Sequence, residues 1–170
     1  LATPVWSALA IRWGKWICYV AATALYAAVS LIFLAVPATA HPQAPLLFAA
    51  GLGIPFGCIM MLPFSMLTDT IQVDKLTTGL HREGVYTGVW MAGEKAGLAM
   101  GPLIVGSILG IAGFIPSIDG AATVQPETAL VGIKAAFAIV PATIVLASLA
   151  LLRLYSLRED MLIRLASEQS

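Results

Sequence analysis

Four long apolar segments constrain the fold of this 170-residue chain more than any other feature. They cover about 16–36, 46–68, 85–114 and 129–152. Each is long enough to cross the ~30 Å hydrocarbon core of a bilayer as a helix. Inside a bilayer the backbone must satisfy its own hydrogen bonds, so spanning segments of this kind are helical. The sequence therefore predicts an all-α membrane protein with four transmembrane helices.

The composition fits a lipid environment and excludes several classes of function. Hydrophobic residues make up 59% of the chain and charged residues 11%, whereas soluble domains carry about 25% charged residues. No basic stripe is present, which excludes a nucleic-acid partner. Cys18 and Cys58 lie inside apolar segments and are interpreted as small hydrophobes. With no cluster of metal ligands and no nucleophile–base pair, we expect no metal, no cofactor and no enzymatic activity.

Basic residues lie at alternate ends of the four segments. Arg12 and Lys15 precede the first, Lys75 and Arg82 lie between the second and third, and Arg153, Arg158 and Arg164 follow the fourth. The loops 37–45 and 115–128 contain no Lys or Arg. The positive-inside rule then predicts that both chain ends and the loop 69–84 are cytoplasmic. Because the chain opens without Met, we interpret it as part of a longer protein, with 1–8 as the end of an earlier helix.

Lys95 and its neighbour Glu94 are the charged residues in the middle of the third apolar segment. A charge at that depth costs about 2.5–3.5 kcal/mol on insertion scales, and such residues mark substrate or ion pathways. A lysine that extends to the headgroups is the alternative, but Lys95 lies too deep to reach an interface easily. A helix–helix contact explains Glu94 equally well. The other segments offer Lys95 no acidic partner, which predicts that the surface facing it lies outside this chain.

Glycines in the same segment predict close helix packing. Gly93, Gly97 and Gly101 recur at a spacing of four, the pattern that lets membrane helices approach each other. At about 100° per residue, Lys95 points away from this glycine stripe. We therefore expect one side of the helix to pack on a neighbour and the other to carry the charge.

The stretch from Asp69 to Gly84, with Lys95 beyond it, resembles one family. This family is the glycoside–pentoside–hexuronide:cation symporters. These are the melibiose-permease-like branch of the major facilitator superfamily. The family pattern is close to D-x-x-D-Y-x-E-x-x-T-G-x-R-R-E-G, followed by Y-x-G and then by a lysine deep in the next helix. The matching residues are Asp69, Thr78, Gly79, Arg82, Glu83, Gly84, Tyr86, Gly88 and Lys95, whereas Gln72, Lys75 and His81 depart from the pattern. Asp74 lies in the same stretch, at a position that the pattern leaves open.

The resemblance implies that residues 1–170 form helices IX–XII, part of the C-terminal half of a twelve-helix carrier whose N-terminal half is missing. It implies Na⁺- or H⁺-coupled symport of a sugar or glycoside across a bacterial inner membrane, with the cation ligands in the missing half. Lys95 and Glu94 would serve substrate binding and cation coupling. Asp69, Asp74, Arg82 and Glu83 would form a cytoplasmic gating loop. Asp69 is expected to close a helix, where the helix dipole disfavours its charge, so a basic partner such as Arg82 is predicted.

Two other functions remain open. The same fold could carry a non-sugar solute, such as a lipid-like molecule or a drug. Less favoured is a stand-alone four-helix membrane protein with a structural role.

Overall fold

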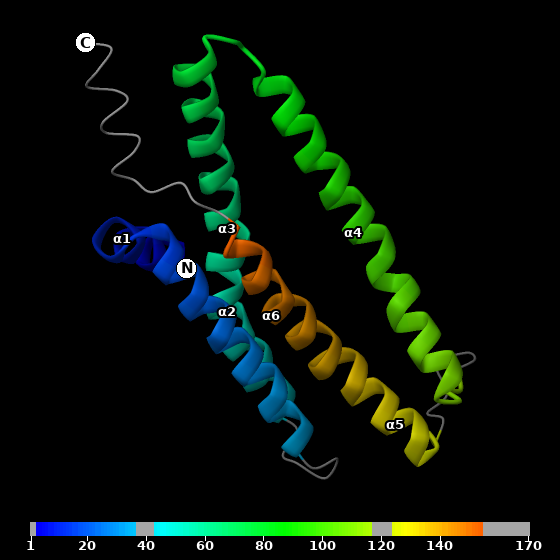
Figure 1. The fold of residues 1–170 in the computed structure, drawn as a ribbon. Coiled ribbons are helices and arrows are strands. Elements are labelled where there is room, and N and C mark those ends of the chain that lie inside the picture. Colours follow the sequence, from blue (N-terminus) through cyan, green and yellow to red (C-terminus); the bar gives the residue numbers. More distant parts are fainter. Residues whose placement is uncertain (1–2, 37–42, 117–123, 155–170) are drawn as a thin grey trace.

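The computed structural model describes residues 3–36, 43–116 and 124–154, and this part of the chain is helical without strands (Figure 1). A short helix, α1 (Thr3–Trp13), comes first. The first span is α2 (Lys15–Ile32), continued by the 3₁₀ turn η1 (Phe33–Ala35). The second is α3 (Ala44–Thr78) and the third α4 (Glu83–Ile111). The fourth combines α5 (Glu127–Lys134), the π-helical segment η2 (Ala135–Ile139) and α6 (Val140–Leu152).

The four predicted spans are confirmed, because these helices are long and apolar enough to cross a membrane. Arg158, Arg164 and most of the loop 37–45 lie outside the described residues. Within the segment 1–8, predicted to end an earlier helix, the described residues 3–8 form the start of α1, which Gly14 separates from α2. Gly14 has φ +87°, a conformation that glycine adopts without strain.

The predicted end of the second span at 68 is wrong for the helix itself. α3 continues through polar residues to Thr78, and Gly79 ends it in the left-handed conformation at φ 69°. The Gly79 N–H donates to the Lys75 carbonyl at 2.9 Å, as in a glycine C-cap. Hydropathy marks where lipid ends, but a helix can continue into water. Asp69 and Asp74 therefore lie on a helix rather than in a loop, and only 79–82 separate α3 from α4.

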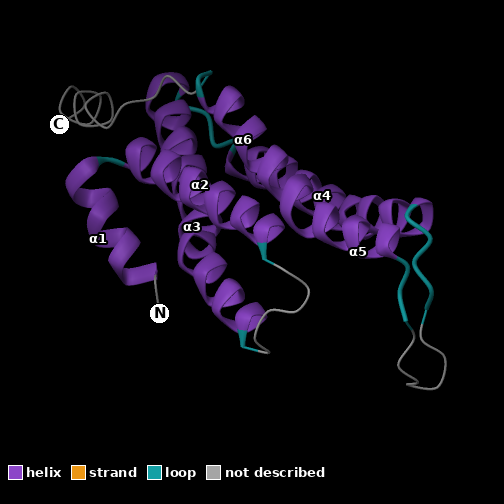
Figure 2. Cartoon of the chain, turned by 90° about the horizontal axis from the view of Figure 1, so that it is seen from below, coloured by secondary structure: helices purple, strands orange, loops and turns teal. Residues whose placement is uncertain are grey.

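The packed part of the bundle is centred on α2, which lies between α3 and the fourth span (Figures 1 and 2). Where α2 packs against the fourth span, the buried residues on both helices are small, so the two backbones lie close together. They are Cys18, Ala22, Thr23, Ala27 and Ser30 on α2, and Ala136, Ala138 and Ala142 on the fourth span. Ala129 and Gly132 are also buried, but they lie on α5, which contacts the end of α4.

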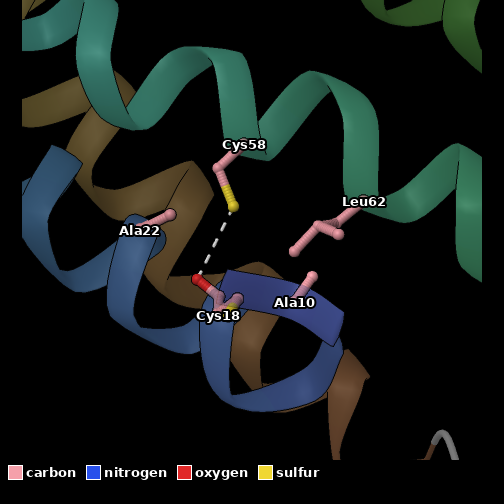
Figure 3. Close-up of a cluster of buried hydrophobic side chains, with 5 residues drawn as sticks. All are labelled: Ala10, Cys18, Ala22, Cys58 and Leu62. Carbon is pink, nitrogen blue, oxygen red and sulfur yellow. Dashed lines mark hydrogen bonds between the residues drawn. The ribbon is translucent and has the colours of Figure 1, made fainter. Parts of the chain in front are cut away.

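A core cluster joins α1, α2 and α3. It consists of Ala10, Cys18, Ala22, Cys58 and Leu62 (Figure 3). The two thiols are free and buried, and the Cys58 Sγ lies 3.6 Å from the Cys18 carbonyl oxygen, to which it donates a weak hydrogen bond. The interpretation of both cysteines as small hydrophobes fits this environment.

Helix α4 stands apart from the other spans along most of its length (Figure 1). None of its residues is buried by the described part of the chain. Its C-terminal end meets α5, where a Cβ built on Gly132 would lie 2.5 Å from the Ala112 Cβ. Nearer its start, the rings of Phe64 and Trp90 meet edge to face at 6.3 Å. A helix that is apolar on all sides and yet uncovered needs lipid or further helices around it.

Candidate functional site

Lys95 lies on the uncovered part of α4. Its side chain is 68% exposed, and its Nζ is 4.0 Å from Glu94 Oε1, the longest ion pair among the described residues. Every residue from 91 to 103 is exposed. The described helices thus provide Lys95 with no partner besides its neighbour in sequence. The prediction that Lys95 and Glu94 belong to a solute or ion site stays a prediction.

The glycine stripe lies on the same uncovered stretch. Cβ atoms built on Gly93, Gly97 and Gly101 meet nothing within 4 Å among the described residues. The helix packing predicted for this stripe is therefore not made by the described helices, and it stays a prediction about another surface.

The predicted pairing of Asp69 with Arg82 is wrong. Asp69 Oδ2 accepts a hydrogen bond from Lys15 Nζ at 2.6 Å, and both side chains are largely buried. Arg82 Nη2 instead donates to Asp74 Oδ1 at 2.7 Å. The reason is that α3 stays helical: residues five positions apart point about 140° apart. Asp69 therefore faces α2, while Asp74 faces the turn into α4.

Glu83 completes the charged cluster at the turn between α3 and α4. Its Oε1 lies 3.2 Å from His81 Nδ1 and 3.7 Å from Lys75 Nζ. The His81 side chain is 69% exposed, so this contact lies in solvent. Lys15 was missed as a site residue. Its place among the basic residues that precede the first span was the available signal.

Two further hydrogen bonds join the packed helices, and the sequence alone did not predict either. Lys134 Nζ donates to the Val36 carbonyl at 2.7 Å, next to the C-terminal end of η1, where helix carbonyls lack partners. The Trp6 indole N–H donates to the Ile54 carbonyl at 2.9 Å and ties α1 to α3. Within the described residues, no three His, Cys, Asp or Glu side chains are grouped so that they could hold a metal ion.

This arrangement of spans and charges can be compared with known proteins. The family model described as MFS/sugar transport protein matches residues 1–159, nearly all of the chain. The chain belongs to this family. The predicted resemblance to melibiose-permease-like carriers is thereby confirmed, and the MFS/sugar transport proteins are transporters rather than enzymes.

Relatives of this chain carry transporter names. It is 33% identical over 153 residues to an uncharacterized symporter of Synechocystis sp., a match that covers 89% of this chain and 28% of the relative. It is 27% identical over 103 residues to the glucuronide carrier protein homolog of Escherichia coli, covering 61% of this chain and 21% of the relative. The chain thus spans about a quarter of the length of these curated relatives. No solved structure matches it significantly.

Proposed function

We propose that this chain forms helices IX–XII of a twelve-helix carrier that couples the uptake of a sugar or glycoside to a Na⁺ or H⁺ gradient. One observation carries the proposal: a lysine in the middle of an apolar span, exposed on a helix that the described residues leave uncovered, in a chain of a sugar-transport family. A third relative, from Escherichia coli, is named for glycoside/cation symport. The proposal that this protein is a symporter is based on that likeness and on Lys95 together.

A further N-terminal half of the same protein is proposed to cover the open side of α4. The uncovered residues 91–103 and the glycine stripe support this assignment, because an apolar helix with a central charge is costly to leave in lipid. Transport then proceeds by alternating access, in which the two halves rock around a site near the middle of the bilayer. Acidic ligands for the cation are expected in that proposed N-terminal half.

Lys95 is proposed to act at that central site. Its ammonium group has three donors and no acceptor, which suits hydroxyl oxygens of a sugar or the carboxylates of a cation site opposite. Glu94 points to an adjacent side of the helix and offers acceptors for sugar hydroxyls. The two side chains together can donate to and accept from one polar solute.

The charged end of the bundle is proposed to be cytoplasmic, in an inner membrane, as the distribution of Lys and Arg predicts. There Lys15–Asp69 fastens α2 to α3, and Asp74–Arg82 fastens α3 to the turn before α4. Glu83 joins the turn to Lys75. Contacts of this kind can hold the cytoplasmic side in one state and yield when the halves rock.

The test is uptake by the complete carrier in vesicles with an imposed Na⁺ or H⁺ gradient. Lys95→Leu should abolish gradient-driven uptake, and Lys95→Arg should keep part of it because the charge remains. Leu98→Met, on the same exposed stretch of α4, is the matched control and should transport like the wild type. Wild-type uptake by Lys95→Leu would reject the role of the lysine. Uptake of sugar that ignores both gradients would reject symport.

A further inference from the structure

A cavity of about 290 Å³, open on one side, lies between the first turns of α2, the interior of α3, Trp90 of α4 and the last turn of α6. Four lining residues have polar side-chain atoms: Tyr19, Thr70, Trp90 and Ser148. The other five lining side chains are proline, methionine or leucine. The cavity is therefore largely apolar, with a size near the lower end of ligand pockets.

Most polar groups in the cavity wall already have partners. Ser148 Oγ donates to the Val145 carbonyl at 2.6 Å, so the Tyr19 hydroxyl, 3.1 Å away, donates to Ser148. Thr70 Oγ1 donates to the Met66 carbonyl at 2.9 Å. Among the described contacts of these residues, the Trp90 indole N–H is the donor left without an acceptor. A sugar needs a partner for nearly every hydroxyl, so this wall suits a hydrocarbon chain with one acceptor group.

The cavity is separate from the proposed solute site. Lys95 follows Trp90 by five positions and points about 140° away around α4. A ligand beside Trp90 therefore lies on the opposite side of α4 from one beside Lys95. The inference below goes beyond the proposed function and does not depend on which solute is carried.

We propose that the cavity binds one acyl chain of a glycerophospholipid from the adjacent leaflet. Arg153 directly follows the lining residue Leu152, caps α6, and has no ion pair among the described residues. Its guanidinium group can bind the lipid phosphate, and the Trp90 N–H can donate to an ester carbonyl. The acid nearest in sequence to the lining, Asp69, is neutralised by Lys15 and does not repel the phosphate. Tryptophan at headgroup level and basic residues between helix ends are typical of lipid-binding sites.

The first measurement follows Trp90 fluorescence in the complete carrier, purified in a non-ionic detergent. A phospholipid brominated on its acyl chain is added, and the signal of Trp90 is isolated by subtracting that of Trp90→Phe. Quenching should saturate at about one lipid per protein. Quenching that never saturates, or that a brominated detergent without phosphate produces equally well, would overturn the proposal.

The second measurement uses paired variants. Ser148→Phe fills the cavity, and Ala147→Phe places the same ring on an exposed position of α6. Only Ser148→Phe should remove most of the saturable quenching. The same variant should also retain about one phospholipid fewer per protein after purification. Arg153→Gln should weaken the affinity for the phospholipid about tenfold, as expected for the loss of a charge-assisted hydrogen bond. Arg12→Gln should change that affinity less than twofold. Equal effects within each pair would contradict the site. If Ser148→Phe fails to fold, the presence or absence of saturable Trp90 quenching in the wild type still tests the proposal. Neither measurement depends on the solute or on the coupling ion.

Discussion

Lys15 and Asp69 lie 54 positions apart in sequence, and their charged atoms meet at 2.6 Å. The pair joins the start of α2 to the part of α3 that continues beyond the apolar segment. It is largely buried, unlike the other ion pairs in the described part of the chain, each of which has a partner more than 40% exposed. Among these ion pairs, mutation of this one should therefore lower the stability of the protein most.

We expect Asp69→Asn to lower the free energy of unfolding by about 1.5–3 kcal/mol, because it leaves the Lys15 ammonium without a counter-charge. Thermal unfolding of the purified protein in detergent measures this. Asp74→Asn is the matched control. It should cost at most about 1 kcal/mol, since its partner Arg82 is 44% exposed and such pairs are weak. The double exchange Lys15→Asp with Asp69→Lys should recover part of the lost stability, and no recovery would argue that the pair itself contributes little.

The contact between α4 and α5 predicts a strong effect of one methyl group. Gly132→Ala places a Cβ 2.5 Å from the Ala112 Cβ, so the helices must separate. Overpacking of this kind costs about 1–3 kcal/mol. Gly110→Ala meets nothing within 4 Å and should be neutral or slightly stabilising. Unfolding measurements on Gly132→Ala combined with Ala112→Gly should show recovery; a Gly132→Ala protein as stable as the wild type would contradict this contact.

Gly79 is expected to fix the length of α3. Its φ of 69° is strained for any residue with a side chain, so Gly79→Ala should cost about 1 kcal/mol. Gly84→Ala lies inside α4 with open space around it and should not destabilise. Both variants can be compared by thermal unfolding. An equal loss in the two would show that the turn does not depend on the left-handed conformation.

Lys134 should hold the far ends of α2 and the fourth span together. Lys134→Met keeps the length of the side chain but removes the hydrogen bond to the Val36 carbonyl, and should cost about 1.5–3 kcal/mol. Lys75→Met, at an exposed position, is the control and should change stability by less than about 1 kcal/mol. Faster hydrogen exchange of the amides at the end of α2 would report the same loosening. Unchanged exchange in Lys134→Met would mean that packing alone holds this end.

The sequence predicted the spans well and the contacts between them less well, for physical reasons. Hydropathy located the four spans because lipid contact selects apolar residues along the whole length of a helix. The same signal could not place the end of α3, which depends on the conformation of Gly79. It also could not name the partner of Asp69, because that depends on which side of α3 faces α2. Lys95 was identified from its depth alone, and what faces it lies beyond the described helices.

The π-helical turn over Ala135–Ile139 has a consequence for how this span tolerates change in length. Such a turn accommodates one surplus residue, and the adjoining Pro141 has no N–H to donate to the preceding turn. Deleting a single alanine there would restore an ordinary α-helix and leave Gly132 and Ala142 still directed toward their neighbours. The same deletion one turn later would rotate everything that follows by about 100° and carry Ser148 away from Tyr19. A deletion of one residue should therefore be accommodated at this point of the helix and should disrupt the packing on either side of it.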